Sequence, residues 1–199
     1  MSGPTILKGH ATDLLQTWDK PLDLIVTDPP YAFGGSGDEH AISATVAVVL
    51  RETAKKLTKG SWMVVLCASS FRSVSYMIES VRGIVDPVRF GSWVKPVSRT
   101  KVSTPGWAWA TVIAIAMRKG PKNRPDIGPL PLLDWVSAPV ETTGRRAQLP
   151  VDVSDWAVRP FSVGGGVFLD PFAGSGALPL AATRCGMESY GFEINPLAR

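Results

Sequence analysis

Residues 28–31, with the sequence D-P-P-Y, have the chemistry to hold a planar base that carries an amino group. Pro29 and Pro30 stiffen the turn and donate no N–H, so their carbonyls can accept hydrogen bonds from a ligand. The Asp28 carboxylate is a further acceptor, and Tyr31 offers a flat aromatic face. An exocyclic amine would donate to Asp28 and to the Pro29 carbonyl while its ring stacks on Tyr31. A turn capped by Asp28 would account for the prolines alone.

A second stretch, V-F-L-D-P-F-A-G-S-G at residues 167–176, has the features of a ligand-binding loop. Gly174 and Gly176 permit a tight turn and a close approach of the backbone to a ligand. Glu193 is expected to end the next strand, where an acid is well placed to accept both hydroxyls of a ribose. The stretch contains neither G-x-G-x-x-G nor G-K-S/T, so the predicted ligand is a nucleoside but not a dinucleotide.

Both stretches follow apolar runs that predict strands of an α/β sheet. The gap between two of these strands is rich in Gly, Pro, Ser and Thr, which favours an antiparallel hairpin. Because strands alternate with helices, we expect helices on both faces of the sheet and ligands outside the carboxyl ends of the strands. The predicted strands are 22–27, 62–68, 88–94, 109–118, 167–170 and 189–194, and the predicted helices are 44–57, 70–82, 151–158 and 177–185.

The composition is that of a globular protein. The chain has 199 residues, 45% hydrophobic and 19% charged, which suits one folded domain and excludes a disordered chain. The first ten residues lack the apolar core of a signal peptide, and the longest apolar runs are too short to span a bilayer. Cys67 and Cys185 lack metal-ligand spacing, so we expect free thiols in a cytoplasmic protein without a metal site.

Positive charge is concentrated in one segment of the chain. Residues 87–125 contain eight Lys and Arg residues but no Asp or Glu, whereas the remainder has 13 basic and 17 acidic residues. This asymmetry predicts a polyanion on one face, with a solvated basic loop as the alternative. Three tryptophans in the same segment favour nucleic acid. The polar turn 96–106 is expected to project toward the substrate, where Lys95, Arg99 and Lys101 would contact phosphates.

These motifs resemble those of S-adenosylmethionine-dependent amino-methyltransferases that act on nucleic acid. D-P-P-Y is similar to their motif IV and D-P-F-A-G-S-G to their motif I, and Asp170 follows Asp28 by 142 residues. That order resembles the circularly permuted β-group of DNA methyltransferases. K-G-H-A-T-D-L-L, W-V-K-P and R-A-Q-L-P-V-D-V resemble further segments of the same family. The resemblance implies a Rossmann-like, mostly parallel sheet with an antiparallel hairpin at one edge, in a protein of bacterial or phage type.

The resemblance also implies a cofactor, S-adenosylmethionine, and a partner, DNA. It places the cofactor against His10, Asp28, Asp170, Pro171, Phe172, Gly174, Gly176 and Glu193. It places the target base against Asp28, Pro29, Pro30 and Tyr31. Adenine N6 is favoured over cytosine N4, because cytosine-N4 members more often carry Ser in place of Asp28. Duplex DNA hides the amine, so the target base must be flipped out or already single-stranded.

The sequence departs from the family pattern at several positions. His10 stands where Asp is usual, Leu149 where Lys is common, and Ala177 where Thr is usual. The family normally inserts a target-recognition domain, whereas here only the Pro- and Gly-rich residues 120–148 are available. We therefore expect one catalytic domain over residues 1–199, with this short insert and a short or relaxed target sequence.

Other functions remain open at this point. RNA adenine methyltransferases share the permuted order but typically have Trp at the position of Tyr31. Enzymes that methylate protein glutamines use a similar turn, usually with Asn first and the glycine loop upstream. A non-catalytic nucleic-acid-binding subunit is a third alternative, although the motifs on both sides of the reaction are intact. The chain could act as a monomer, as a homodimer or with a partner subunit that supplies recognition.

Overall fold

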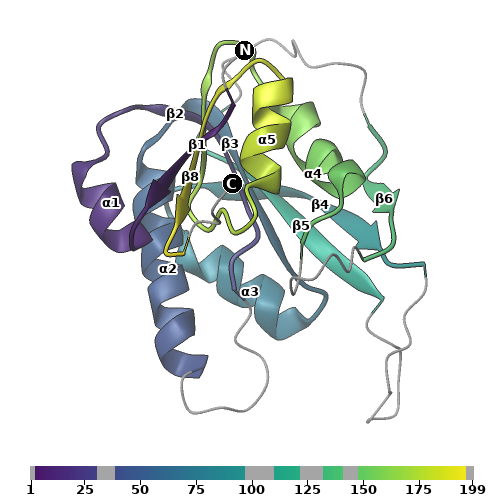
Figure 1. The fold of residues 1–199 in the computed structure, drawn as a ribbon. Coiled ribbons are helices and arrows are strands. Elements are labelled where there is room, and N and C mark those ends of the chain that lie inside the picture. The colour runs from purple at the N-terminus through teal and green to yellow at the C-terminus, as the bar shows by residue number, and fades with distance from the viewer. Residues whose placement is uncertain (1–2, 31–38, 97–109, 122–131, 141–147, 196–199) are drawn as a thin grey trace.

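The chain folds around one eight-stranded mixed sheet (Figure 1). A computed structural model of the 199-residue chain describes residues 3–30, 39–96, 110–121, 132–140 and 148–195. The strand order is β1-β8-β7-β2-β3-β5-β4-β6. In chain order the elements are β1 (Thr5–Lys8), α1 (Ala11–Thr17), β2 (Leu22–Thr27), α2 (Glu39–Lys55), β3 (Leu57–Ala68), α3 (Phe71–Ser80), β4 (Asp86–Val94), β5 (Thr111–Arg118), β6 (Trp135–Ser137), α4 (Val151–Val158), the 3-10 turn η1 (Arg159–Phe161), β7 (Val167–Asp170), α5 (Ala177–Arg184) and β8 (Glu188–Glu193).

Every strand and helix that the apolar pattern predicts is present; β2, α4 and β7 have the predicted bounds, and the other predicted elements have shifted ends. The largest shift among the strands is in β3, which begins at Leu57 rather than at residue 62. The intervening Gly60 has a φ of 84°, and the pairing of β2 with β3 slips between Leu22 and Leu24. This irregularity has the character of a bulge, which lets the strand continue through a sequence that reads locally as a turn.

The edges of the sheet differ from the prediction. The antiparallel pairing of β4 with β5 confirms the hairpin, but β6 pairs in parallel with β4 and forms the outer edge instead. Neither β1 nor β6 was predicted, because strands of four and three residues carry too little alternation to be recognised. The segment 120–148 thus contributes a strand to the sheet. Within the described ranges, no helix is long and apolar enough to cross a membrane.

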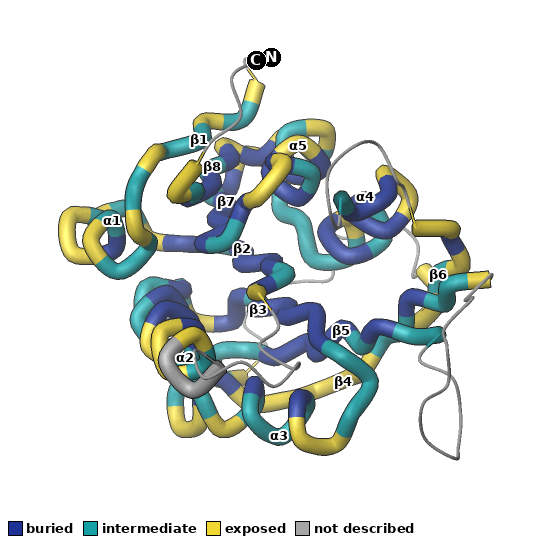
Figure 2. Tube along the Cα trace, turned by 60° about the horizontal axis from the view of Figure 1, so that its bottom comes forward, coloured by how far each residue is buried: buried dark blue, intermediate teal, exposed yellow. Residues whose placement is uncertain are grey.

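Two hydrophobic layers enclose the sheet, one on each face. Figure 2 shows α1, α2 and α3 on one side of the strands and α4 and α5 on the other. The first layer is centred on fully buried Ile25 and Met63 and includes Leu50 of α2 and Met77 of α3. The second is centred on Leu24, Val64 and Phe168 and includes Val153 of α4 and Leu178 of α5. Consecutive residues of β2 therefore enter opposite layers, as expected for a strand covered on both faces.

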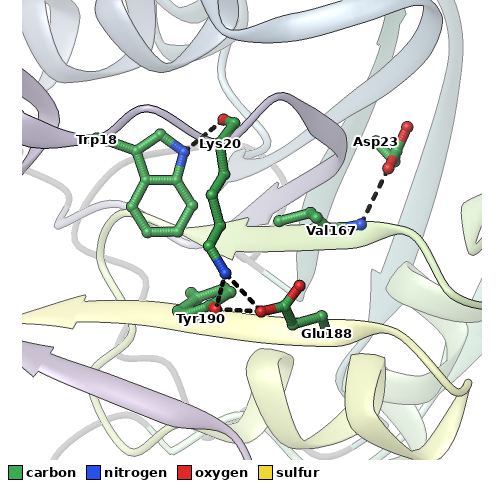
Figure 3. Close-up of polar contacts among 6 residues, drawn as sticks. All are labelled: Trp18, Lys20, Asp23, Val167, Glu188 and Tyr190. Carbon is green, nitrogen blue, oxygen red and sulfur yellow. Dashed lines mark hydrogen bonds and ion pairs between the residues drawn. The ribbon is translucent and has the colours of Figure 1, made fainter.

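The amino end of the parallel strands is fastened by polar contacts (Figure 3). Lys20 Nζ lies 2.6 Å from Glu188 Oε1 and also hydrogen-bonds to the Tyr190 hydroxyl, and the Glu188 hydrogen bond raises the pKa of Lys20. Asp23 Oδ2 accepts from the Val167 backbone N–H at 3.0 Å. These contacts connect β2 with β7 and β8 at the amino ends of the strands. The predicted site lies at the opposite, carboxyl ends.

Candidate active site

Both sequence motifs lie at the carboxyl edge of the sheet. The strands β1, β8, β7, β2 and β3 are parallel neighbours, so their carboxyl ends meet at one edge. Thr27, the last residue of β2, is buried, and after it Asp28 is half-buried, Pro29 is buried and Pro30 is exposed. Tyr31 lies outside the described residues. The turn that follows β2 therefore presents its acid and its second proline at this edge.

Asp170 connects the ends of β2 and β7. Its Oδ1 accepts from the Thr27 hydroxyl at 2.7 Å and from the Phe172 backbone N–H at 3.0 Å. Burial, with a smaller effect of the charges of Asp28 and Glu193, raises the pKa of Asp170 from 3.8 to about 7 against the opposing effect of the two hydrogen bonds. Because the charges of Asp28 and Glu193 both act on Asp170, the two motifs share one electrostatic environment.

The glycine loop leads from β7 into α5 through two left-handed residues. Gly174 has a φ of 51° and Gly176 a φ of 81°, conformations that disfavour a side chain. The loop is held by the Ala173 N–H, which donates to the Phe192 carbonyl at 2.9 Å, and by the Gly174 N–H, which donates to Glu193 Oε2 at 2.9 Å. A Cβ on Gly174 would have no heavy atom within 4 Å. The backbone at Gly174 therefore faces open space, where a ligand can approach closely.

Glu193 and His10 lie side by side at the ends of β8 and β1. Lys8 pairs with Glu193 across the two strands, and the Gly9 N–H donates to the Glu193 carbonyl at 3.1 Å. His10 is exposed and precedes α1 without a side-chain capping bond. The Glu193 carboxylate already accepts two backbone N–H groups, from Gly174 and Asn195. A ligand that binds Glu193 would share or replace these donors.

The carboxyl edge is acidic. Asp28 and Glu193 are each close enough to act electrostatically on Asp170, and Asp28 also contributes, after burial, to raising the pKa of the Cys67 thiol to about 12. Such an edge favours a cationic ligand with hydroxyl groups over an anionic one. Among the described residues, no three His, Cys, Asp or Glu side chains are grouped to hold a metal ion. Both cysteines are free thiols, as the sequence predicts.

The described cations of the basic segment do not gather on one face. Lys95, at the end of β4, lies at the carboxyl edge with its ammonium 4.9 Å from the centre of the buried Trp93 ring. Arg118 and Lys119 lie at the opposite edge, because β5 runs antiparallel to β3. Lys119 Nζ donates to the Lys55 and Leu57 carbonyls at 2.6 and 2.8 Å, and burial lowers its pKa. The charge of Lys119 therefore stabilises the end of α2. Arg99 and Lys101 lie outside the described residues.

Sequence reasoning missed two residues that shape the site. Thr27 is the donor that joins the strand ends, and its role depends on β7 lying beside β2. Gly191 of β8 packs under the glycine loop, because a Cβ there would lie 2.5 Å from Ala173 Cβ and 2.8 Å from Ile6 Cδ1. Gly191 lies two residues before Glu193 in the sequence, but only the packing shows why a larger residue does not fit.

Comparison with known proteins gives structural matches alone. No protein-family model matches the chain, and no curated protein matches it in sequence. TTHA0409 from Thermus thermophilus, described only provisionally as a DNA modification methylase, superposes with a TM-score of 0.75 at 22% identity over 97% of this chain and 90% of its own. M1.HpyAVI superposes with a TM-score of 0.74 at 20% identity, over 96% of this chain and 92% of its own. PvuII DNA methyltransferase, which is cytosine-N4-specific, superposes with a TM-score of 0.77 at 17% identity, over 98% of this chain and 83% of its own. The chain therefore has the Rossmann-like fold of these methyltransferases.

Proposed function

We propose that this chain transfers a methyl group from S-adenosylmethionine to the exocyclic amino group of a base in DNA. The observation that carries the proposal is the junction of the two motifs. The Thr27–Asp170 hydrogen bond of 2.7 Å joins the strand that ends in Asp28 to the strand that ends in the glycine loop. A site for a nucleoside cofactor and a site for an amine then lie next to each other on one rigid edge, as a direct transfer between them requires.

The residues at this edge fit S-adenosylmethionine. The cofactor carries a cationic sulfonium whose methyl group is the electrophile. Asp28 supplies negative charge near such a cation, and the open backbone at Gly174 leaves room beside Glu193 for a ribose. Solved structures of M1.HpyAVI and TTHA0409 include complexes with this compound. We assign cofactor contacts to His10, Asp28, Asp170, Pro171, Phe172, Gly174, Gly176 and Glu193.

The chemistry assigned to the turn after β2 is orientation of the amine. The lone pair of an exocyclic amine is delocalised into the ring, which makes the nitrogen a poor nucleophile. Asp28 and the Pro29 carbonyl would accept its two hydrogens and direct the lone pair at the methyl group, while Tyr31 stacks on the base. Asp28 need not be a strong base, because the proton can leave after the nitrogen has become cationic. A half-buried carboxylate at the strand end suits this role.

The finer assignment is adenine N6, based on Asp28 in a position where cytosine-N4 enzymes more often have Ser. We further propose a single catalytic domain in which the segment 120–148 replaces a recognition domain. Few side chains then reach base edges, and each bidentate contact provides only about 1–3 kcal/mol of discrimination. A short or relaxed target sequence follows, unless a partner subunit supplies recognition.

Incubation with labelled S-adenosylmethionine tests the proposal. The protein is offered DNA, RNA and a protein mixture separately, each substrate is digested, and the labelled product is identified. We expect N6-methyladenine from DNA. N4-methylcytosine would correct the base, label in RNA would correct the substrate, and label only in protein would refute the proposal.

A pair of variants tests the role of Asp28. Asp28→Ala should abolish transfer and weaken cofactor binding only in part, because Asp28 orients the amine and is one of several proposed cofactor contacts. Asp152→Ala, at an exposed acid in the first turn of α4, is the matched control and should retain wild-type turnover. Near-normal turnover of Asp28→Ala would show that another group orients the amine.

A further inference from the structure

We propose that Phe71 is a base-stacking wedge, which occupies the space left in a DNA duplex when the target base leaves the helix. This inference rests on the proposed function and adds to it a residue that acts on the duplex rather than on the reacting atoms. Phe71 is 90% exposed, more than any other large hydrophobic side chain among the described residues. Exposure of a single apolar residue is common, so the inference depends on the position of Phe71 and on the hydrogen bonds that hold its backbone.

Phe71 lies at the same edge as Asp28, on the neighbouring strand connection. β3 pairs in parallel with β2, and Thr27 is opposite Val65. β3 continues to Ala68, three residues past that pair, which is about 10 Å at the rise of a strand. Phe71 follows as the first residue of α3. It therefore lies on the connection next to the turn holding Asp28, at the carboxyl ends of the strands where the proposed site lies.

The backbone that carries Phe71 is held firmly. The Ser70 N–H donates to the Ala68 carbonyl at 2.8 Å, and the Ser70 hydroxyl accepts from the Ser73 N–H at 3.1 Å as the cap of α3. Ser73 and Met77 form the buried face of the helix, and Phe71 belongs to neither hydrophobic layer. The side chain thus contributes little to packing, while its backbone is fixed. Because the backbone is already fixed, only the side-chain torsions of Phe71 need to be ordered when its ring stacks on a base.

The charge beside the ring suits nucleic acid. Arg72, the next residue, is exposed, and Lys95 lies at the same edge at the end of β4. These cations would contact phosphates, while Asp28 and Glu193 serve the proposed base and cofactor sites. Extrusion of a base costs stacking and pairing energy, and proteins that distort DNA often offset this cost with an apolar wedge.

The experiment compares native and heat-denatured samples of one unmethylated plasmid. Initial methylation rates are measured on both for wild type, Phe71→Ala, Phe71→Trp and Phe90→Ala. Phe90 is a matched control: its ring is also exposed, at 51%, but it pairs with Ile115 in the middle of β4, away from the carboxyl edge. Because Phe71 is outside the packed layers, thermal unfolding should show the same midpoint for Phe71→Ala as for wild type.

We expect Phe71→Ala to lower the ratio of native to denatured rates roughly 5- to 150-fold, the range for loss of one aromatic–base stack. Phe71→Trp should keep most of the wild-type ratio, and Phe90→Ala should match it. An unchanged ratio for Phe71→Ala, or equal losses on both substrates, would overturn the wedge. Wild-type activity on denatured DNA alone would also overturn it and leave the methyltransferase assignment intact. Absence of wild-type activity on either DNA would instead refute the proposed function, and the wedge with it.

Discussion

Replacement of Asp170 by Asn tests whether burial raises the pKa of this carboxyl. Asp170 is 1% exposed, and burial is the main reason that its pKa rises from 3.8 to about 7. Asn keeps an oxygen that can accept from the Thr27 hydroxyl and the Phe172 N–H, but it cannot ionise. The variant therefore mimics the wild-type protein with Asp170 protonated. Its stability should diverge from that of wild type only at pH values where Asp170 is ionised in the folded or the unfolded state.

The sign of the effect follows from the direction of the pKa shift. Because the folded-state pKa lies above the unfolded value, the folded protein holds a proton between about pH 4 and pH 7 that the unfolded chain has released. The stabilisation from this proton is complete below the unfolded pKa and is lost as the pH rises through the folded pKa. The unfolding free energy attributable to Asp170 falls by about 1.4 kcal/mol per pH unit in this window, or at most about 2–3 kcal/mol between pH 5 and pH 7.

Chemical denaturation at pH 5 and pH 8 measures this change. The stability of Asp170→Asn relative to wild type should increase by about 2–3 kcal/mol between the two pH values. The control is Asp152→Asn, at an exposed carboxyl of α4, whose relative stability should stay constant. A constant difference between Asp170→Asn and wild type would show that Asp170 ionises near its ordinary pKa and would refute the burial argument.

Three further predictions concern the loop and the aromatic face. Gly174→Ala and Gly165→Ala, at φ values of 51° and 76° with no neighbour within 4 Å, should each lose about 1–2 kcal/mol of stability, but calorimetry should show weakened S-adenosylmethionine binding only for Gly174→Ala. Gly191→Ala should destabilise the fold by about 1–3 kcal/mol in denaturation experiments, because its Cβ would lie 2.5 Å from Ala173 Cβ; a neutral result would show that the loop can move away. Tyr31→Phe should keep most activity, whereas Tyr31→Ala should lose about 1–3 kcal/mol of base stabilisation in steady-state assays. Equal damage from both Tyr31 variants would point to the hydroxyl.

The central strands could be predicted because they are buried on both faces. Within β2 and β7, residues 24–26 and 167–169 are short apolar runs, and each strand is followed by a chemically unusual turn. In a parallel sheet this alone predicts that Asp28 and the glycine loop share an edge. The resemblance to permuted methyltransferases added the order of the motifs, and the structure confirms the corresponding Rossmann-like sheet.

Contacts between distant segments could not be predicted. The bond from Thr27 to Asp170 spans 143 positions of sequence and requires β7 to pair with β2. The edge strands β1 and β6 are short, and their pairing is decided by the strands beside them rather than by their own pattern. The count of positive charge failed for a similar reason, since it treats Lys95 and Lys119 as equivalent although β4 and β5 carry them to opposite edges.

In the proposed complex with DNA, the hydrogen bonds of Lys119 limit how strongly salt can weaken binding. Each phosphate contact with duplex DNA contributes about 0.9 to the slope of log affinity against log salt, so eight cations would give a slope of about −7. Lys119 is bound to carbonyls at the end of α2, and Arg118 lies at the same remote edge, which leaves six cations in residues 87–125. That segment can therefore contribute a slope no steeper than about −5. Any steeper dependence must come from cations elsewhere on the chain, such as Arg72 beside the exposed ring of Phe71.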